Sequence, residues 1–246
     1  MNRVLFPFRI LWRIYFLLVF CILLIFFYPF LYIIFLREGP WPSAFFICRV
    51  IVKSMLFAAG IRYRITYEEP LKKDRVHIFC PNHSSYLDIV VCYVVIPFYF
   101  IFMGKSELGK VPFFSIFFKK MNTLVDRQSI MGSHKAYMLI GKEIDKGHSV
   151  VLFPEGKIPK NAPVLNPFKN GAFKLAVDKQ APIVPVTFLN NWKIIPHNEN
   201  VKNHGGPGIS RIIVHKVIET KGMTEENIEE LKSRVYQVIF NSLKDD

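Results

Sequence analysis

His83 and Asp88 are the residues of this chain whose types and spacing best suit proton transfer. They lie five positions apart, directly after residues 76–80, a largely apolar run that is typical of a buried strand. If the loop between them turns back, Nδ1–H of the imidazole donates to the carboxylate. The carboxylate then fixes the tautomer, and Nε2 is left as a base. The spacing alone fits equally well a histidine that only caps a turn.

The sequence offers this base no protein nucleophile. It contains no Gly-x-Ser-x-Gly turn, and its four cysteines are scattered along the chain: Cys21, Cys48, Cys80 and Cys92. We therefore predict that His83 activates a hydroxyl group of the substrate. The cysteines also lack the spacing of a zinc site or a disulfide framework, so we predict no metal and no bound cofactor.

A second turn strengthens the functional interpretation. Residues 150–153 read as another apolar strand, and Pro154-Glu155-Gly156 follows it. The histidine–aspartate pair after one strand and Phe-Pro-Glu-Gly after a later one together resemble the glycerolipid acyltransferase family, most closely the bacterial 1-acylglycerol-3-phosphate acyltransferases. The resemblance spans residues 79–188. Its further motifs are Lys105-Ser106-Glu107-Leu108 with Pro112, Asp126-Arg127, Phe168-Lys169-Asn170-Gly171-Ala172 and Val184-Pro185-Val186.

The resemblance implies a reaction and its partners. A fatty acyl group would pass from an acyl thioester to the free hydroxyl of a lysophospholipid, with 1-acylglycerol-3-phosphate as the expected acceptor and phosphatidic acid as the product. The donor, acyl-CoA or acyl-acyl carrier protein, would be a co-substrate. The resemblance further implies direct attack without an acyl-enzyme, with His83 returning its proton to the leaving thiolate.

Cations are expected to hold the phosphate of the acceptor. The family's second motif implies Lys105 and Arg127 for this role. Glu155 is expected to organise its turn or to pair with a cation, because an ionised carboxylate would repel a phosphate. The backbone N–H groups of Glu155 and Gly156 are candidates for the oxyanion site, since glycine permits close approach of the backbone.

The chain departs from the family directly after Glu155-Gly156. The family usually continues with Thr-Arg, and that arginine looks like a phosphate ligand, whereas this chain has Lys157-Ile158-Pro159-Lys160. The side chain of Ile158 cannot bind phosphate. Either Lys157 or Lys160 substitutes for the arginine, or the acceptor carries another headgroup, because lysine and arginine are not equivalent at a bidentate site. Other lysolipids, aminolipids included, therefore remain open as acceptors.

Composition points to a membrane and to an anionic partner. The chain is 51% hydrophobic and 15% aromatic, and its formal net charge is +13. Such a charge favours lipid headgroups, nucleic acid or an acidic carrier protein. Nucleic-acid binders usually interleave cations with exposed aromatics, but here the cations are dispersed, so we predict no nucleic-acid partner. A non-catalytic basic membrane-surface protein and a hydrolase that directs His83 at water remain as alternatives.

The first 60 residues are predicted to form a membrane anchor. Arg3, Arg9 and Arg13 precede the uncharged run 14–36, whose roughly 34 Å of helix would cross a bilayer core. The run is too long for the apolar core of a cleaved signal peptide. The apolar segment 40–60 suggests a second helix, giving a hairpin that spans the membrane or is embedded in one leaflet. The basic N-terminus predicts the inner membrane, with the catalytic domain facing the cytoplasm.

Residues 61–246 are predicted to form an α/β catalytic domain. Strand patterns are found at 61–67, 76–80, 98–103, 150–153, 183–189 and 209–217, and helical patterns at 87–95, 129–146, 171–177 and 224–243. Strands that alternate with helices favour a mostly parallel sheet with helices on both faces.

Overall fold

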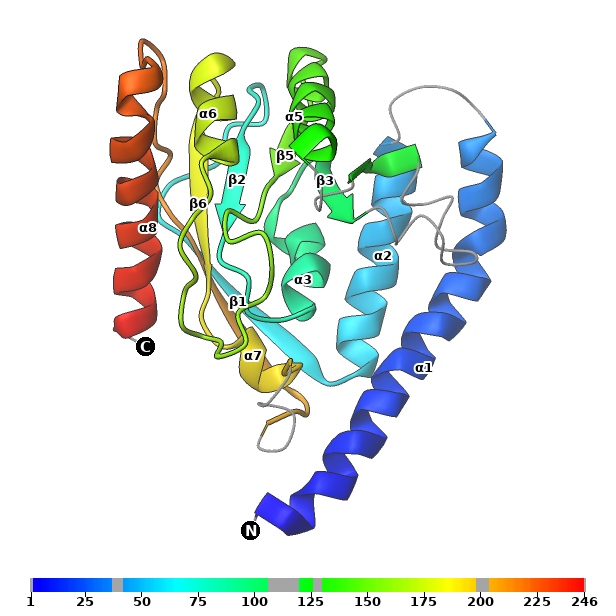
Figure 1. The fold of residues 1–246 in the computed structure, drawn as a ribbon. Coiled ribbons are helices and arrows are strands. Elements are labelled where there is room, and N and C mark those ends of the chain that lie inside the picture. The colour runs from blue at the N-terminus through cyan, green and yellow to red at the C-terminus, as the bar shows by residue number, and fades with distance from the viewer. Residues whose placement is uncertain (1, 37–41, 106–119, 126–129, 198–203, 246) are drawn as a thin grey trace.

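The computed structural model describes residues 2–36, 42–105, 120–125, 130–197 and 204–245 (Figure 1). Its centre is a seven-stranded sheet in the order β1-β7-β6-β2-β5-β3-β4. The strands are β1 (Ile61–Tyr67), β2 (Ile78–Pro81), β3 (Phe100–Lys105), β4 (Thr123–Val125), β5 (Ser149–Val151), β6 (Ile183–Phe188) and β7 (Gly208–Val214). All neighbouring strands are parallel except β6 and β7. The predicted α/β fold with a mostly parallel sheet is confirmed.

Helices cover both faces of this sheet (Figure 1). The helices are α1 (Asn2–Phe35), α2 (Pro42–Ala58), α3 (Leu87–Val95), α5 (Ile130–Asp145), α6 (Gly171–Asp178), α7 (Asn191–Ile194) and α8 (Ile228–Lys244), with a 3₁₀ turn at Glu225–Asn227. One buried apolar cluster joins α2 and α3 to the sheet, and a second joins α5, α6 and α8 to its other face. The helical spacing of Ile228, Leu231, Val235 and Ile239 explains how α8 buries one side.

The connection between β6 and β7 turns the chain around. Val186, Thr187 and Phe188 pair with Val214, Ile213 and Ile212 in antiparallel register. Since β1 is parallel to β7 and β2 is parallel to β6, β1 runs opposite to β2. The beginning of β1 therefore lies at the end of the sheet where β2 finishes.

The long helix α1 is apolar along most of its length. The span Phe6–Phe35 contains an 18-residue window with a mean hydropathy of 2.8, and the helix is long and apolar enough to cross a membrane, by length and composition alone. The start of α1 lies beside the end of α2, where Trp12 Nε1 donates to the carbonyl oxygen of Ala59 and Tyr15 Oη donates to that of Ala58. How deeply these helices enter a bilayer, and a domain boundary between residues 60 and 61, stay predictions.

Candidate active site

The predicted histidine–aspartate pair is assembled at the carboxyl end of β2. β2 lies between β5 and β6 near the centre of the sheet, and His83 follows its last residue, Pro81, by two positions. Asp88 is the second residue of α3, so the helix start carries the carboxylate back toward the imidazole. His83 Nδ1 lies 3.1 Å from Asp88 Oδ2, with 12% of the histidine side chain exposed and none of the aspartate side chain.

Asp88 is held by hydrogen bonds on both carboxylate oxygens. The backbone N–H groups of Ser84 and Ser85 donate to Oδ2 over 2.6 and 2.8 Å, and Asn191 Nδ2 donates to Oδ1 over 2.8 Å. An ionised carboxylate can only accept, so the bond with His83 requires the proton on Nδ1. Nε2 is then the unprotonated nitrogen of the neutral ring, which is the state a general base requires.

Asn191 is a site residue that the sequence reasoning missed. Its side chain is fully buried at the start of α7, and its Oδ1 accepts a 2.6 Å hydrogen bond from Ser210 Oγ of β7. A second hydrogen bond links the His83 loop to the residues around α7: Ser85 Oγ donates to the carbonyl oxygen of Ile195 over 2.6 Å. One feature of the sequence could have indicated Asn191: it is a polar residue that follows soon after the predicted strand 183–189. Functional residues often lie on loops that follow strands.

Glu155 organises the loop that carries the histidine. Its Oε1 accepts from the backbone N–H of His83 over 2.7 Å, and its Oε2 accepts from that of Asn166 over 2.8 Å. The residue is only 3% exposed, and this burial raises the pKa of its carboxyl to about 7. These contacts agree with the expected role of Glu155 in organising its own turn. They also show that Glu155 binds the loop that carries His83.

Phe153 connects the histidine to an apolar cavity. Its ring stacks on the imidazole of His83, with 4.1 Å between ring centroids. The same residue lines a cavity of about 280 Å³ between β5, α5 and α6, together with Met103, Leu152 and Lys169. An apolar cavity of this kind is suited to hydrocarbon, and it begins one side chain away from the proposed base.

The turn at Gly156 places a lysine at the edge of that cavity. Gly156 has φ +74°, and a Cβ built there would lie 3.1 Å from both Cε and Nζ of Lys169. The Gly156 N–H donates to the carbonyl oxygen of Phe153 over 3.0 Å, so it is engaged within the turn rather than aimed at a substrate oxygen. Lys157 and Lys160 are exposed on the following loop. Lys169 belongs to the motif Phe168-Lys169-Asn170-Gly171-Ala172, which by itself predicts no role for this side chain.

Two predicted phosphate ligands lie outside what the structure describes. Lys105 is the last residue of β3, but the structure does not describe its side chain. Arg127 lies in the segment 126–129, which is outside the described residues. Within the described ranges, no group of three or more His, Cys, Asp or Glu side chains could hold a metal ion.

The chain matches known acyltransferases over most of its length. A family model described as acyltransferase matches residues 62–189. The 1-acyl-sn-glycerol-3-phosphate acyltransferase of Borreliella burgdorferi is 30% identical over 204 residues, covering 82% of this chain and 79% of that protein. The enzyme of the same name from Haemophilus influenzae is 27% identical over 187 residues, covering 75% and 74%.

The fold also matches a solved structure. The crystal structure of the 1-acyl-sn-glycerophosphate acyltransferase from Thermotoga maritima aligns with a TM-score of 0.80 at 20% identity, covering 100% of this chain and 97% of that one. At this level of identity the likeness establishes the shared fold alone.

Proposed function

The chain belongs to the acyltransferase family, and we propose that it transfers a fatty acyl group from an acyl thioester to the free hydroxyl of 1-acylglycerol-3-phosphate, giving phosphatidic acid. The observation that supports the mechanism is the 3.1 Å contact between His83 Nδ1 and Asp88 Oδ2, because in a neutral imidazole it holds the proton on Nδ1 and makes Nε2 the candidate base. The names of the relatives support the choice of acceptor.

The reaction proceeds by direct attack on the thioester. His83 Nε2 removes the proton of the acceptor hydroxyl as its oxygen bonds to the thioester carbonyl carbon, forming a tetrahedral intermediate. Collapse of the intermediate breaks the C–S bond, and the imidazolium returns the proton to the leaving thiolate. Asp88 stabilises the imidazolium between these steps without taking its proton. Backbone or side-chain donors must stabilise the oxyanion, and the engaged N–H of Gly156 does not supply this function in the conformation described.

Lysines near the Glu155-Gly156 turn are proposed to hold the acceptor phosphate. Lys157 and Lys160 are exposed, as a cation that meets a soluble headgroup must be. Lys169 lies against Gly156 and lines the cavity that Phe153 shares, so it is the described lysine best placed to bring a phosphate toward His83. Lys105 and Arg127 remain proposed ligands on the strength of the family motif.

The exposed apolar helix α1 suits an enzyme whose acceptor and product are lipids. Its side chains at Leu11, Ile25 and Ile33 are 61%, 68% and 62% exposed, which a bilayer would cover. We propose attachment to the inner membrane with the catalytic domain facing the cytoplasm. The acceptor would then reach His83 from the lipid phase, and the donor, carried by coenzyme A or by acyl carrier protein, would arrive from water.

An acyl-transfer assay tests this proposal. The full chain in mixed micelles is offered labelled acyl-CoA or acyl-acyl carrier protein with a panel of lysolipids. We expect labelled phosphatidic acid from 1-acylglycerol-3-phosphate and none from His83→Ala. If only another lysolipid, such as an aminolipid, is acylated, the acceptor specificity differs from that of the relatives. The replacement of the family's arginine by Ile158 would then mark this change of specificity. Release of free fatty acid without any acceptor would identify a hydrolase.

A further inference from the structure

The outer side of helix α5 carries exposed methionines and lysines. Its buried residues Ala136, Ile140 and Ile144 recur every four positions and face the sheet. At about 100° of rotation per residue, four exposed side chains fall within about 60° of one another on the opposite side of the helix. These four residues, which we call the α5 stripe, are Met131, Lys135, Met138 and Lys142.

Two methionines of the α5 stripe are open to solvent. Met131 is 83% exposed and Met138 is 50% exposed, one on each side of Lys135 along the helix. The thioether side chain is flexible and polarizable, and methionine is enriched at protein–protein interfaces. Because they are seven residues apart, the two side chains offer a partner a pair of apolar anchors about 10 Å apart.

The lysines of the α5 stripe are open to an acidic partner. Among the residues that the structure describes, neither Lys135 nor Lys142 forms an ion pair, and both are exposed. The two acidic residues at the end of α5 are already paired with other lysines, Glu143 with Lys146 over 2.6 Å and Asp145 with Lys179 over 2.5 Å. The stripe therefore combines apolar anchors with positive charge, which complements an acidic protein surface.

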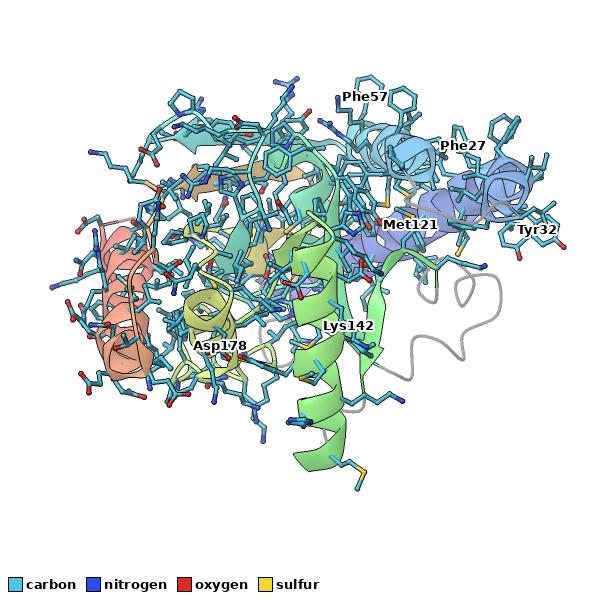
Figure 2. The ribbon with its side chains drawn as sticks, turned by 90° about the horizontal axis from the view of Figure 1, so that it is seen from above. Phe27, Tyr32, Phe57, Met121, Lys142 and Asp178 are labelled. Atoms are coloured by element: carbon cyan, nitrogen blue, oxygen red, sulfur yellow. The ribbon has the colours of Figure 1, made fainter. Side chains whose placement is uncertain are left out.

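The α5 stripe lies away from the apolar helices of the predicted anchor. Helices α1 and α2 belong to the buried cluster on one face of the sheet, and α5 belongs to the cluster on the other face. In Figure 2, the labelled Phe57 of α2 lies at the upper edge of the molecule, and α5 with the labelled Lys142 projects from the lower edge. A bilayer that covers α1 and α2 leaves the α5 stripe in water, within reach of a soluble partner.

The inner side of α5 faces the cavity beside the active site. Tyr137 and Ile140 line this cavity of about 280 Å³, and so does Phe153, whose ring stacks on His83. A helix with its side chains is about 10–12 Å across, so the α5 stripe lies one helix diameter from the cavity wall. An acyl carrier protein holds its thioester at the end of an extended prosthetic arm, which suits delivery over such a distance.

We propose that the α5 stripe is the docking surface for an acidic acyl carrier protein, an inference that rests on the proposed acyl transfer. The lysines pair with carboxylates of the carrier protein, and the methionines pack against its apolar side chains. Coenzyme A presents the thioester without a protein and would leave the methionines uncovered. An anionic bilayer would also complement the lysines, but the apolar helices α1 and α2 lie on the other face of the sheet.

Binding of the carrier protein to the full chain tests this docking surface without relying on catalysis. The dissociation constant for holo acyl carrier protein is measured in detergent micelles at low salt. An exposed ion pair contributes up to about fivefold, so Lys135→Gln with Lys142→Gln should raise the dissociation constant roughly tenfold. Met131→Ala with Met138→Ala should also weaken binding, whereas Lys135→Arg with Lys142→Arg keeps the charges and should preserve it.

A matched control removes two lysines near α8, which α6 separates from α5 (Figure 1). Lys221 precedes α8 and Lys244 is its last residue, and both are exposed. Lys221→Gln with Lys244→Gln changes the net charge by the same amount. This control should leave the dissociation constant within about twofold of wild type, because charges beyond the screening length contribute little.

Kinetics distinguish the carrier protein from other partners. Lys135→Gln with Lys142→Gln should raise KM for acyl-acyl carrier protein about tenfold and leave KM for acyl-CoA unchanged. Unchanged binding of the carrier protein would overturn the proposal, as would an equal loss in the control, an equal rise in KM for acyl-CoA, or a loss confined to phosphatidylglycerol vesicles. A wild-type protein that uses neither donor would contradict the proposed function, whereas the dissociation constant decides the docking surface separately.

Discussion

The side-chain amide of Asn191 donates a 2.8 Å hydrogen bond to Asp88 Oδ1, although 103 residues separate them in the chain. Both side chains are fully buried, and Ser210 Oγ holds the amide from its other side. The orientation of Asp88, and through it of His83, is therefore fixed by residues of α7 and β7. This relationship makes Asn191 a positioning residue for the proposed base.

Asn191→Ala should lower kcat about tenfold and leave KM for the lipid acceptor nearly unchanged. The substitution removes one donor from a buried carboxylate, a loss of about 1–3 kcal/mol that acts on the geometry of the base and not on substrate binding. Steady-state kinetics in mixed micelles measure the two constants separately. The neighbouring Asn190→Ala is the control, since Asn190 binds only backbone groups of Ile209 and Arg211. Equal losses in the two variants would assign Asn191 a purely structural role.

Glu155 should make the protein less stable as the pH rises from about 4.5 to 7. Burial raises the folded-state pKa of this carboxyl from 4.5 to about 7, so in this range the folded state binds more protons than the unfolded state. Stability then falls with pH, by about 3 kcal/mol over the whole interval, and levels off above it. Unfolding free energies of wild type and Glu155→Gln are compared across this range. The glutamine variant should lack this decline, and parallel curves would contradict the assignment.

Lys169→Ala should raise KM for the phosphate-bearing acceptor about tenfold, more than Lys157→Ala or Lys160→Ala. All three lysines are exposed, but Lys169 lies against Gly156 and lines the cavity, whereas Lys157 and Lys160 are not among the residues that line it. A charge-assisted hydrogen bond to phosphate is worth about 1.5–3 kcal/mol, which corresponds to tenfold or more. KM is measured for each variant at saturating donor. A larger effect of Lys157 or Lys160 would transfer the phosphate-binding role to that residue.

Gly156→Ala should destabilise the protein by about 1–2 kcal/mol and also raise KM for the acceptor. Its φ of +74° is unfavourable for any side chain, and the new Cβ would lie 3.1 Å from the end of Lys169. Gly171→Ala is the matched control, because a Cβ there meets nothing within 4 Å and the residue is helical. Thermal unfolding and acceptor kinetics are measured on both variants. Equivalent behaviour of the two would show that the Gly156 turn is not constrained as described.

Local patterns in the sequence predicted much of the fold. The alternating run 61–67 is strand β1, the apolar run 87–95 is helix α3, and the periodic segment 129–146 contains α5. Each of these elements shows a periodic pattern of side chains within one short stretch of the chain, and that pattern can be read without knowing its partners. The antiparallel direction of β7 was not predicted, because pairing between β6 and β7 is decided by tertiary packing.

The same distinction explains which site residues the sequence revealed. His83 and Asp88 share one loop and helix start, so their spacing carried the prediction. Asn191 reaches Asp88 only through the arrangement of α3, α7 and β7, and the proximity of Lys169 to Gly156 depends on the path of the intervening loop. Contacts of this kind leave no spacing pattern along the chain.

A double-mutant cycle between His83 and Asp88 tests the central claim most directly. Acyl transfer to 1-acylglycerol-3-phosphate is measured for His83→Ala, Asp88→Asn and the double variant. General-base catalysis is worth roughly 10²–10⁴-fold, so we expect His83→Ala to lose at least about a hundredfold in kcat. If Asp88 acts through His83, adding Asp88→Asn should cost almost nothing further. Wild-type activity in His83→Ala, or losses that multiply in the double variant, would contradict the account.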